Sequence, residues 1–171
     1  MTQKALFPMK SHRISADYKG SAAHRACSQG TPHDYPTDLI GHDSGRDWFR
    51  APCDLIVLRR YTKASHAIWM RSLTKVKTPY GTGYLYIMVE HQDNSEMKGV
   101  GEIYRQGRQC FREGRNGNAS GNHLHVSCGF SKSLRPLGGT GWKKNSRGAW
   151  VLYIPGVKPI KLNQAFFEEV V

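Results

Sequence analysis

The 171-residue chain has no run of eighteen apolar residues, which is about the length that a membrane-spanning helix needs. Its first ten residues, Met1–Lys10, contain only a short apolar patch and do not resemble a secretory signal. We therefore expect a soluble protein with no signal peptide and no membrane span. Such a protein would reach a target outside the cell by lysis, by injection or as part of a larger particle.

Cysteine is scarce, and the four cysteines include no CxxC pair, which excludes a zinc ribbon and a disulfide-rich scaffold. Three of them lie within apolar runs and are predicted to be buried free thiols: Cys53, Cys110 and Cys128.

Acidic residues are few: 13 Asp and Glu stand against 25 Lys and Arg, giving a net charge of +12 and a pI of about 9.8. This charge favours an anionic partner, and nucleic acid, anionic lipid and the acidic polymers of a bacterial wall all fit it. The basic residues are spread along the chain without a helix-turn-helix, zinc-finger or RNA-binding strand motif, so we expect no specific nucleic-acid recognition.

The composition predicts a mainly β, single-domain protein, since 18 Gly and 8 Pro separate many short β-branched or aromatic runs. We expect a basic leader at residues 1–13, with at most one edge strand, followed by one domain at 14–171 and no linker or internal repeat. A long irregular region, Ile14–Pro52, precedes the ordered strands. The predicted strands are Cys53–Tyr61, His66–Ser72, Tyr84–His91, Val100–Gln106, Gln109–Glu113 and Ala149–Ile154. Gln92–Gly99 is expected to be a loop with one helical turn, residues 138–145 an exposed loop, and Leu162–Val171 a short helix.

The stretch Asn116–Cys128, NGNASGNHLHVSC, is the centre of the functional prediction. If it continues as a strand, the two-residue period puts His123, His125 and Ser127 on one face and the apolar Leu124, Val126 and Cys128 on the other. Two imidazoles about 7 Å apart along a strand can serve one metal site. The alternative is a pair of histidines on a solvated face.

A hydrolytic zinc site typically needs three protein ligands and one open position. Asp38 is the best upstream carboxylate, because it follows a Pro-containing turn and opens a short apolar run. A further imidazole would come from the same irregular region, as His24 or His33. In the strand Tyr84–His91, the alternation places His91 on the same face as Leu85, Ile87 and Val89.

The ordered set of an upstream His, an Asp that opens a strand, a strand-terminal His and then GNASGNHLH resembles the lysostaphin-type (LytM-like) zinc endopeptidases, in particular their bacteriophage branch. The resemblance covers roughly residues 14–168. It rests on the segments Ile14–His24, Asp34–Asp38, Gly45–Asp47, Pro52–Asp54, Ile68–Trp69, Phe111–Gly114, and Gly141–Trp142 through Trp150.

This resemblance implies an antiparallel β-sheet fold with a zinc cleft flanked by long loops. It makes His24, Asp38 and His125 the ligands of one Zn²⁺, with His33 as the alternative to His24, and His91 and His123 the catalytic pair. A zinc ion in such a site lowers the pKa of its bound water to ~7 and polarises the scissile carbonyl. One histidine would act as general base and then acid, and the other would stabilise the oxyanion.

The implied function is cleavage of peptide bonds in bacterial peptidoglycan by a phage endolysin or tail-associated lysin. Such a protein would reside in the virion or in the host cytoplasm before lysis. Its expected partners are the wall peptide, possible anionic wall polymers and possible phage tail proteins. The alternatives are a catalytically silent wall-binding or tail structural module of the same fold and, from another class, a basic nucleic-acid-binding domain.

Overall fold

The computed structural model describes residues 1–10, 12–20, 24, 35–41, 46–63, 66–117, 119–135, 141–144 and 150–171. The predicted alternative ligand His33 lies outside these described residues.

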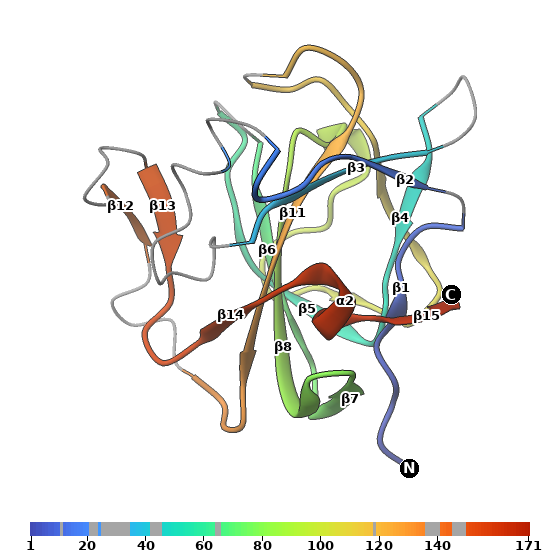
Figure 1. Ribbon diagram of the computed structural model, residues 1–171, viewed down its shortest axis with the longest axis vertical. Coiled ribbons are helices and arrows are strands. Elements are labelled where there is room, and N and C mark those ends of the chain that lie inside the picture. Colours follow the sequence, from blue (N-terminus) through green and yellow to red (C-terminus); the bar gives the residue numbers. More distant parts are fainter. Residues whose placement is uncertain are drawn as a thin grey trace.

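One large antiparallel sheet forms the centre of the molecule (Figure 1). Its strands follow the order β2 (Arg13–Ala16), β3 (Thr37–Ile40), β11 (Leu124–Ser131), β8 (Gly81–Glu90), β6 (Ile68–Ser72), β5 (Leu55–Arg60) and β9 (Ile103–Tyr104). Two short strands pair alongside, β14 (Lys158–Ile160) with β11 and β7 (Val76–Thr78) with β8. The two longest strands, β8 and β11, therefore lie next to each other in the interior of the sheet.

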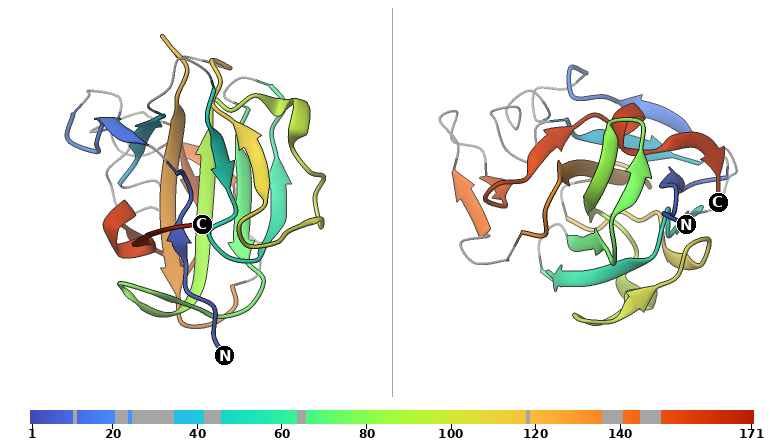
Figure 2. Two further views of the ribbon diagram at one scale, coloured as in Figure 1. Left: turned by 90° about the vertical axis from the view of Figure 1, so that its right-hand side faces the viewer. Right: turned by 90° about the horizontal axis from the view of Figure 1, so that it is seen from below.

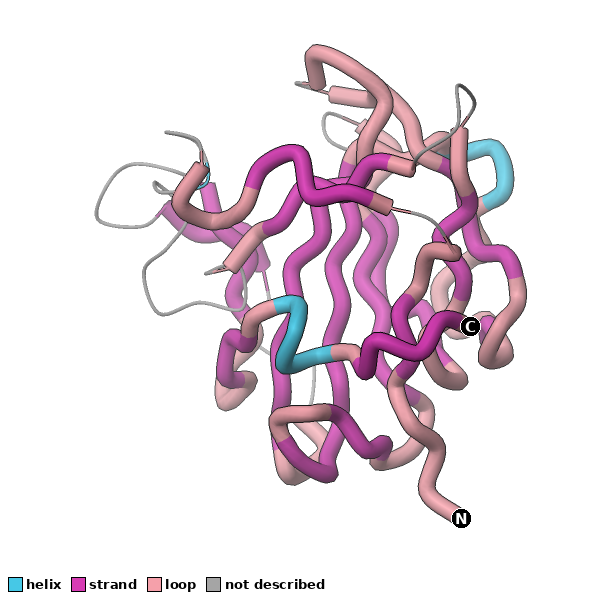
Figure 3. The backbone as a smooth tube through the Cα atoms, turned by 45° about the vertical axis from the view of Figure 1, so that its right-hand side comes forward, coloured by secondary structure: helices cyan, strands magenta, loops and turns pink. Residues whose placement is uncertain are grey.

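Three small two-stranded sheets accompany the central one. They pair β10 (Gln109–Arg112) with β4 (Trp48–Arg50), β12 (Gly141–Lys144) with β13 (Trp150–Tyr153), and β1 (Leu6–Phe7) with β15 (Phe167–Val170). The β1–β15 pair is parallel and brings the first and last strands side by side (Figure 2). The helical elements with described bounds are short, the 3₁₀ turn η1 (Asn94–Glu96) and the single turn α2 (Leu162–Ala165) (Figure 3). Within the described ranges, no helix has the length and apolar character needed to cross a membrane.

The two faces of the central sheet have different packing. In β8, Leu85, Ile87 and Val89 belong to the main core, and their cross-strand partners in β11 are Phe130, Cys128 and Val126. On the opposite face Tyr86 and Met88 belong to a second, smaller cluster. The alternation therefore fixes which residues of β11 are buried in the main core, and it puts His125 on the face that carries the smaller cluster.

The mainly β prediction is confirmed, and so is the prediction that Cys53, Cys110 and Cys128 are buried free thiols. Burial raises the pKa of each of these thiols well above its usual range.

Two local predictions were wrong. The predicted loop at 138–145 contains strand β12, which is stabilised by pairing with β13. The predicted helix Leu162–Val171 is helical only at α2, because the following residues form β15 and pair with β1. Strand β12 depends on the next strand in the chain, whereas β15 depends on β1 at the other end of the sequence.

The predicted leader contributes to the core. Ala5 and Met9 are fully buried, and Ala5 donates its backbone N–H to the carbonyl of Lys77 at 2.8 Å. The boundary at residue 14 stays a prediction.

Candidate metal centre and neighbouring histidines

The adjacent strands β3, β11 and β8 place three polar side chains next to one another. In β11, His125 is directly paired with Asp38 of β3 on one side and with Glu90 of β8 on the other. Directly paired residues of an antiparallel sheet present their side chains on the same face. All three side chains therefore lie on the face opposite the main core.

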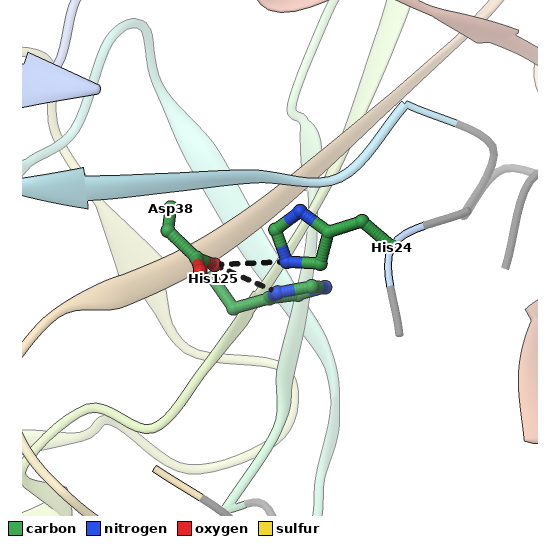
Figure 4. Close-up of side chains that lie close together, drawn as sticks. All are labelled: His24, Asp38 and His125. Atoms are coloured by element: carbon green, nitrogen blue, oxygen red, sulfur yellow. Dashed lines mark hydrogen bonds and ion pairs between the residues drawn. The ribbon is translucent and has the colours of Figure 1, made fainter. Parts of the chain in front are cut away.

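His24 completes a compact cluster with Asp38 and His125 (Figure 4). The Oδ1 atom of Asp38 lies 3.2 Å from Nε2 of His24 and 3.0 Å from Nδ1 of His125. Each of the three residues offers one ligand atom, and these three atoms lie within 4.8 Å of one another. The histidines are 5% and 7% exposed, respectively, so the cluster is largely shielded from solvent.

The cluster fits a zinc ion in its donor set and its spacing. Two imidazoles and one carboxylate are a typical donor set for a zinc site that keeps one position open. Two donors at about 2.0–2.1 Å from a tetrahedral zinc are separated by about 3.3 Å. The distances of 3.2 Å and 3.0 Å are close to that value.

Contacts around the cluster orient the ligands. Nδ1 of His24 donates to the carbonyl of Asp17 at 2.8 Å, which leaves Nε2 directed at Asp38. Nε2 of His125 lies 3.7 Å from Oε2 of Glu90, so the ring stands between two carboxylates. Such outer contacts fix the tautomer and the direction of a metal-binding imidazole.

The electrostatics of the cluster favour an ionised Asp38. Burial alone would raise the pKa of Asp38, but hydrogen bonds from His125 and His24 outweigh burial and hold that pKa well below its usual range. Burial alone would lower the pKa of His24, and its bonds to Asp38 and the Asp17 carbonyl outweigh this and raise it. A carboxylate charged at every physiological pH is suited to bind a cation.

The two predicted catalytic histidines lie beside this cluster. The ring centroids of His91 and His123 are 4.8 Å apart, and those of His91 and His125 are 5.9 Å apart. Nε2 of His123 is 3.8 Å from Oδ1 of Asp38. All five residues singled out from the sequence are therefore gathered in one place.

The predicted placement of His91 was wrong in one respect. Strict alternation puts its side chain with Leu85, Ile87 and Val89, in the core. Strand β8 ends at Glu90, however, and His91 has a φ of 69°, in the left-handed region. This backbone turn breaks the two-residue period and directs the ring to His123 and His125.

Both of these histidines have one ring nitrogen engaged by the backbone. Nδ1 of His91 donates to the carbonyl of Asn116 at 2.7 Å, and Nδ1 of His123 donates to the carbonyl of Gly121 at 2.9 Å. The other nitrogen, Nε2, is thus the one available for proton transfer. Burial lowers the pKa of His91, and nearby His125 and His123 lower it further. A neutral ring at pH 7 is what a proton acceptor requires.

Sequence reasoning gave Glu90 no role in the site, and it predicted Gly114–Gly121 only as a loop beside the cleft. Strand alternation assigned Glu90 to the face of β8 opposite the core, which is correct. Its position next to His125 depends on the register of β8 against β11, which the local pattern does not reveal. Gly114 forms an isolated bridge with His123, and Asn116 contacts His91, so this segment links the two histidines.

A polar cleft of about 420 Å³ adjoins the histidine pair, lined by Arg46, Asp93, Gly114, Arg115, Asn116 and Asn122. A larger cavity of about 840 Å³ lies between the N-terminal strands and α2, with Phe7, Tyr18 and Phe166 among its lining residues. None of the five clustered residues lines either cavity. Gly114 and Asn116 of the smaller cleft contact His123 and His91, so this cleft is the candidate for a substrate site beside the histidine pair.

No family model matches the chain. Morphogenesis protein 1 of Bacillus phage B103 is 28% identical over 125 residues, which are 73% of this chain and 32% of the relative. The chain thus spans about a third of that protein's length.

Two solved structures have a similar fold at 14% identity. A zinc-containing peptidase from Vibrio cholerae has a TM-score of 0.46 over 75% of this chain and 36% of that one. The SpoIIQ–SpoIIIAH pore-forming complex has a TM-score of 0.48 over 94% of this chain and 95% of that one. Similarities this distant say nothing about the chemistry of the cluster.

Proposed function

We propose that this chain is a zinc-dependent endopeptidase of the lysostaphin type that hydrolyses peptide bonds in bacterial peptidoglycan. The observation that carries the proposal is the cluster of His24, Asp38 and His125, with two further histidines beside it. A three-ligand cluster with two imidazoles next to it suits hydrolysis by an activated water.

His24, Asp38 and His125 would hold the zinc. When bound, the ion activates a water molecule and polarises the carbonyl of the scissile bond. Because His91 and His123 have Nδ1 engaged by the backbone, each can accept a proton at Nε2 when neutral. One ring takes the proton of the attacking water and delivers it to the leaving amine. The other, when protonated at Nε2, donates that N–H to the negative oxygen that develops on the scissile carbonyl.

The deciding experiment combines metal analysis with turnover of purified cell walls. We expect about one zinc per chain and release of free amino groups, and both should be lost in His125→Ala. His12→Ala is the matched control, because it removes a histidine that stacks on Phe7, away from the cluster. Wall hydrolysis that survives both EDTA and His125→Ala would rule out the metallopeptidase.

The first ligand can be tested separately. His24→Ala should lose zinc, whereas His33→Ala should retain it. The reverse result would replace His24 with His33 as the ligand. Replacement of His91 or His123 should retain zinc and lower turnover by ~10²–10⁴-fold, the usual contribution of a general acid–base group.

The second candidate is a catalytically silent module of the same fold that binds the wall or takes part in a phage tail. Zinc binding without release of amino groups, in a protein that still sediments with cell walls, would favour it. The net charge of +12 suits adhesion to anionic wall polymers in either case.

The phage setting rests on the relative named as a morphogenesis protein. We propose that the protein resides in the virion or in the host cytoplasm before lysis and acts on the wall, with phage tail proteins as possible partners.

A further inference from the structure

The polar cleft beside His91 and His123 contains two arginines with different surroundings. Arg46 is paired with Asp93 through a contact of 2.6 Å between Nη1 and Oδ2. Arg115 is exposed and forms no side-chain hydrogen bond or ion pair within the described part of the chain. Asn122, at the same cleft, likewise has a side-chain amide without a described partner. Counting only described residues, the cleft therefore has one positive charge and one side-chain amide without a partner.

The backbone of Arg115 is held between the two histidines. On one side, the N–H of His123 donates to the carbonyl of Gly114 at 3.1 Å. On the other side, the N–H of Asn116 donates to the carbonyl of His91 at 3.3 Å, and Nδ2 of Asn116 donates to the carbonyl of Gln92 at 2.7 Å. Arg115 is thus one residue away from contacts with each histidine.

Close packing restricts this segment further. A Cβ atom at Gly114 would lie 2.4 Å from the carbonyl oxygen of His91 and 2.6 Å from the backbone nitrogen of Asp93. Only glycine permits such an approach of two backbones. The base of the Arg115 side chain is consequently fixed relative to the reacting groups.

We propose that Arg115, assisted by Asn122, binds a carboxylate that the peptide substrate bears next to the scissile bond. A guanidinium presents paired N–H donors that match the two oxygens of a carboxylate. This inference rests on the proposed function and specifies its substrate class: an acidic peptide, not a neutral one.

The test uses two synthetic wall peptides that differ only at that group, one with a free carboxylate and one with the carboxylate converted to an amide. Their hydrolysis by the zinc-loaded protein is compared with hydrolysis by Arg115→Ala and Arg115→Lys. Arg108→Ala is the matched control, because Arg108 is also exposed and lies outside the cleft.

We expect the wild type to prefer the acidic peptide by about tenfold in kcat/KM, as for one partly exposed charge-assisted hydrogen bond. The preference should come mainly from KM. Arg115→Ala should lose this preference, because only the hydrolysis of the acidic peptide becomes slower. Arg115→Lys should retain part of the preference, and Arg108→Ala should retain all of it. Equal turnover of both peptides by the wild type, or an undiminished preference in Arg115→Ala, would overturn the inference.

Calorimetric binding of the same peptides to the zinc-free protein separates this inference from the proposed function. Preferential binding of the acidic peptide, lost in Arg115→Ala, supports the carboxylate site even if no peptide is cleaved. Cleavage of both peptides without any binding preference retains the peptidase and rejects the carboxylate site. If Arg115→Ala fails to fold, the wild-type protein still tests the carboxylate site, because equal turnover and equal binding of the two peptides would overturn it.

Discussion

Glu90 is expected to set the strength with which His125 holds zinc, and Glu90→Gln tests this. Glu90 and His125 are paired across β8 and β11, and both side chains are 9% exposed. If zinc takes Nδ1 of His125, the proton must reside on Nε2, which lies 3.7 Å from Oε2 of Glu90. The carboxylate then stabilises the N–H and makes the opposite nitrogen a stronger donor to the metal.

The size of the effect follows from this geometry. A hydrogen bond to a charged group contributes about 1.5–3 kcal/mol. The 3.7 Å separation exceeds the usual hydrogen-bond length, so the lower end of that range or slightly less applies. We expect a loss of about 1.4 kcal/mol, which is about tenfold in the dissociation constant. Glutamine has the shape of glutamate, so packing should be preserved and the free energy of unfolding little changed.

The assay is competition for zinc against a chromophoric chelator at fixed pH. Glu96→Gln is the control, because it removes the same charge from an exposed glutamate in η1 whose contact with Arg112 is 3.9 Å long. A dissociation constant for Glu90→Gln within twofold of the Glu96→Gln value would refute the orienting role of Glu90.

Three further predictions concern stability and reactivity. Gly114→Ala should lower the free energy of unfolding by about 3 kcal/mol or more, because its Cβ would lie 2.4 Å from the His91 carbonyl. Gly121→Ala, with nothing within 4 Å of the added Cβ, should be nearly neutral in the same denaturant titration. The three buried cysteines should resist alkylation at pH 8 in the native protein and react after unfolding, as peptide mapping would show; prompt native labelling would contradict their burial. The pKa of Asp54 is lowered, against burial, by bonds from the Gln106 N–H and Arg105, so its stabilisation should be present above pH ~4 and vanish as pH falls through the folded pKa. Unfolding of Asp54→Asn and wild type across that range checks this; a difference that grows on acidification would contradict it.

The strand pattern and the opposite faces of β11 could be predicted from the sequence, because a two-residue period is a local property. Leu124, Val126 and Cys128 are buried in the core as expected, and His125 lies on the other face. The prediction that His24, Asp38, His91, His123 and His125 form one site came from resemblance to a family. Spacing alone left His24 and His33 as alternatives.

The remaining features depend on contacts between distant segments. The place of Glu90 beside His125 requires the register of two strands that are far apart in the chain. The turn of His91 depends on a positive φ at the end of β8, which no feature of YLYIMVEH indicates. The strand β12 differs from these cases, because it pairs with β13, the next strand in the chain.

Strand β11 has a consequence for how this fold can change over time. Its core face fixes the register, since a slip of one residue would exchange His125 with Leu124 or Val126. Its other face can accept new side chains without disturbing the core. Substitutions at the histidines should therefore leave folding intact, so that descendants of this chain could lose the proposed hydrolysis and persist as scaffolds.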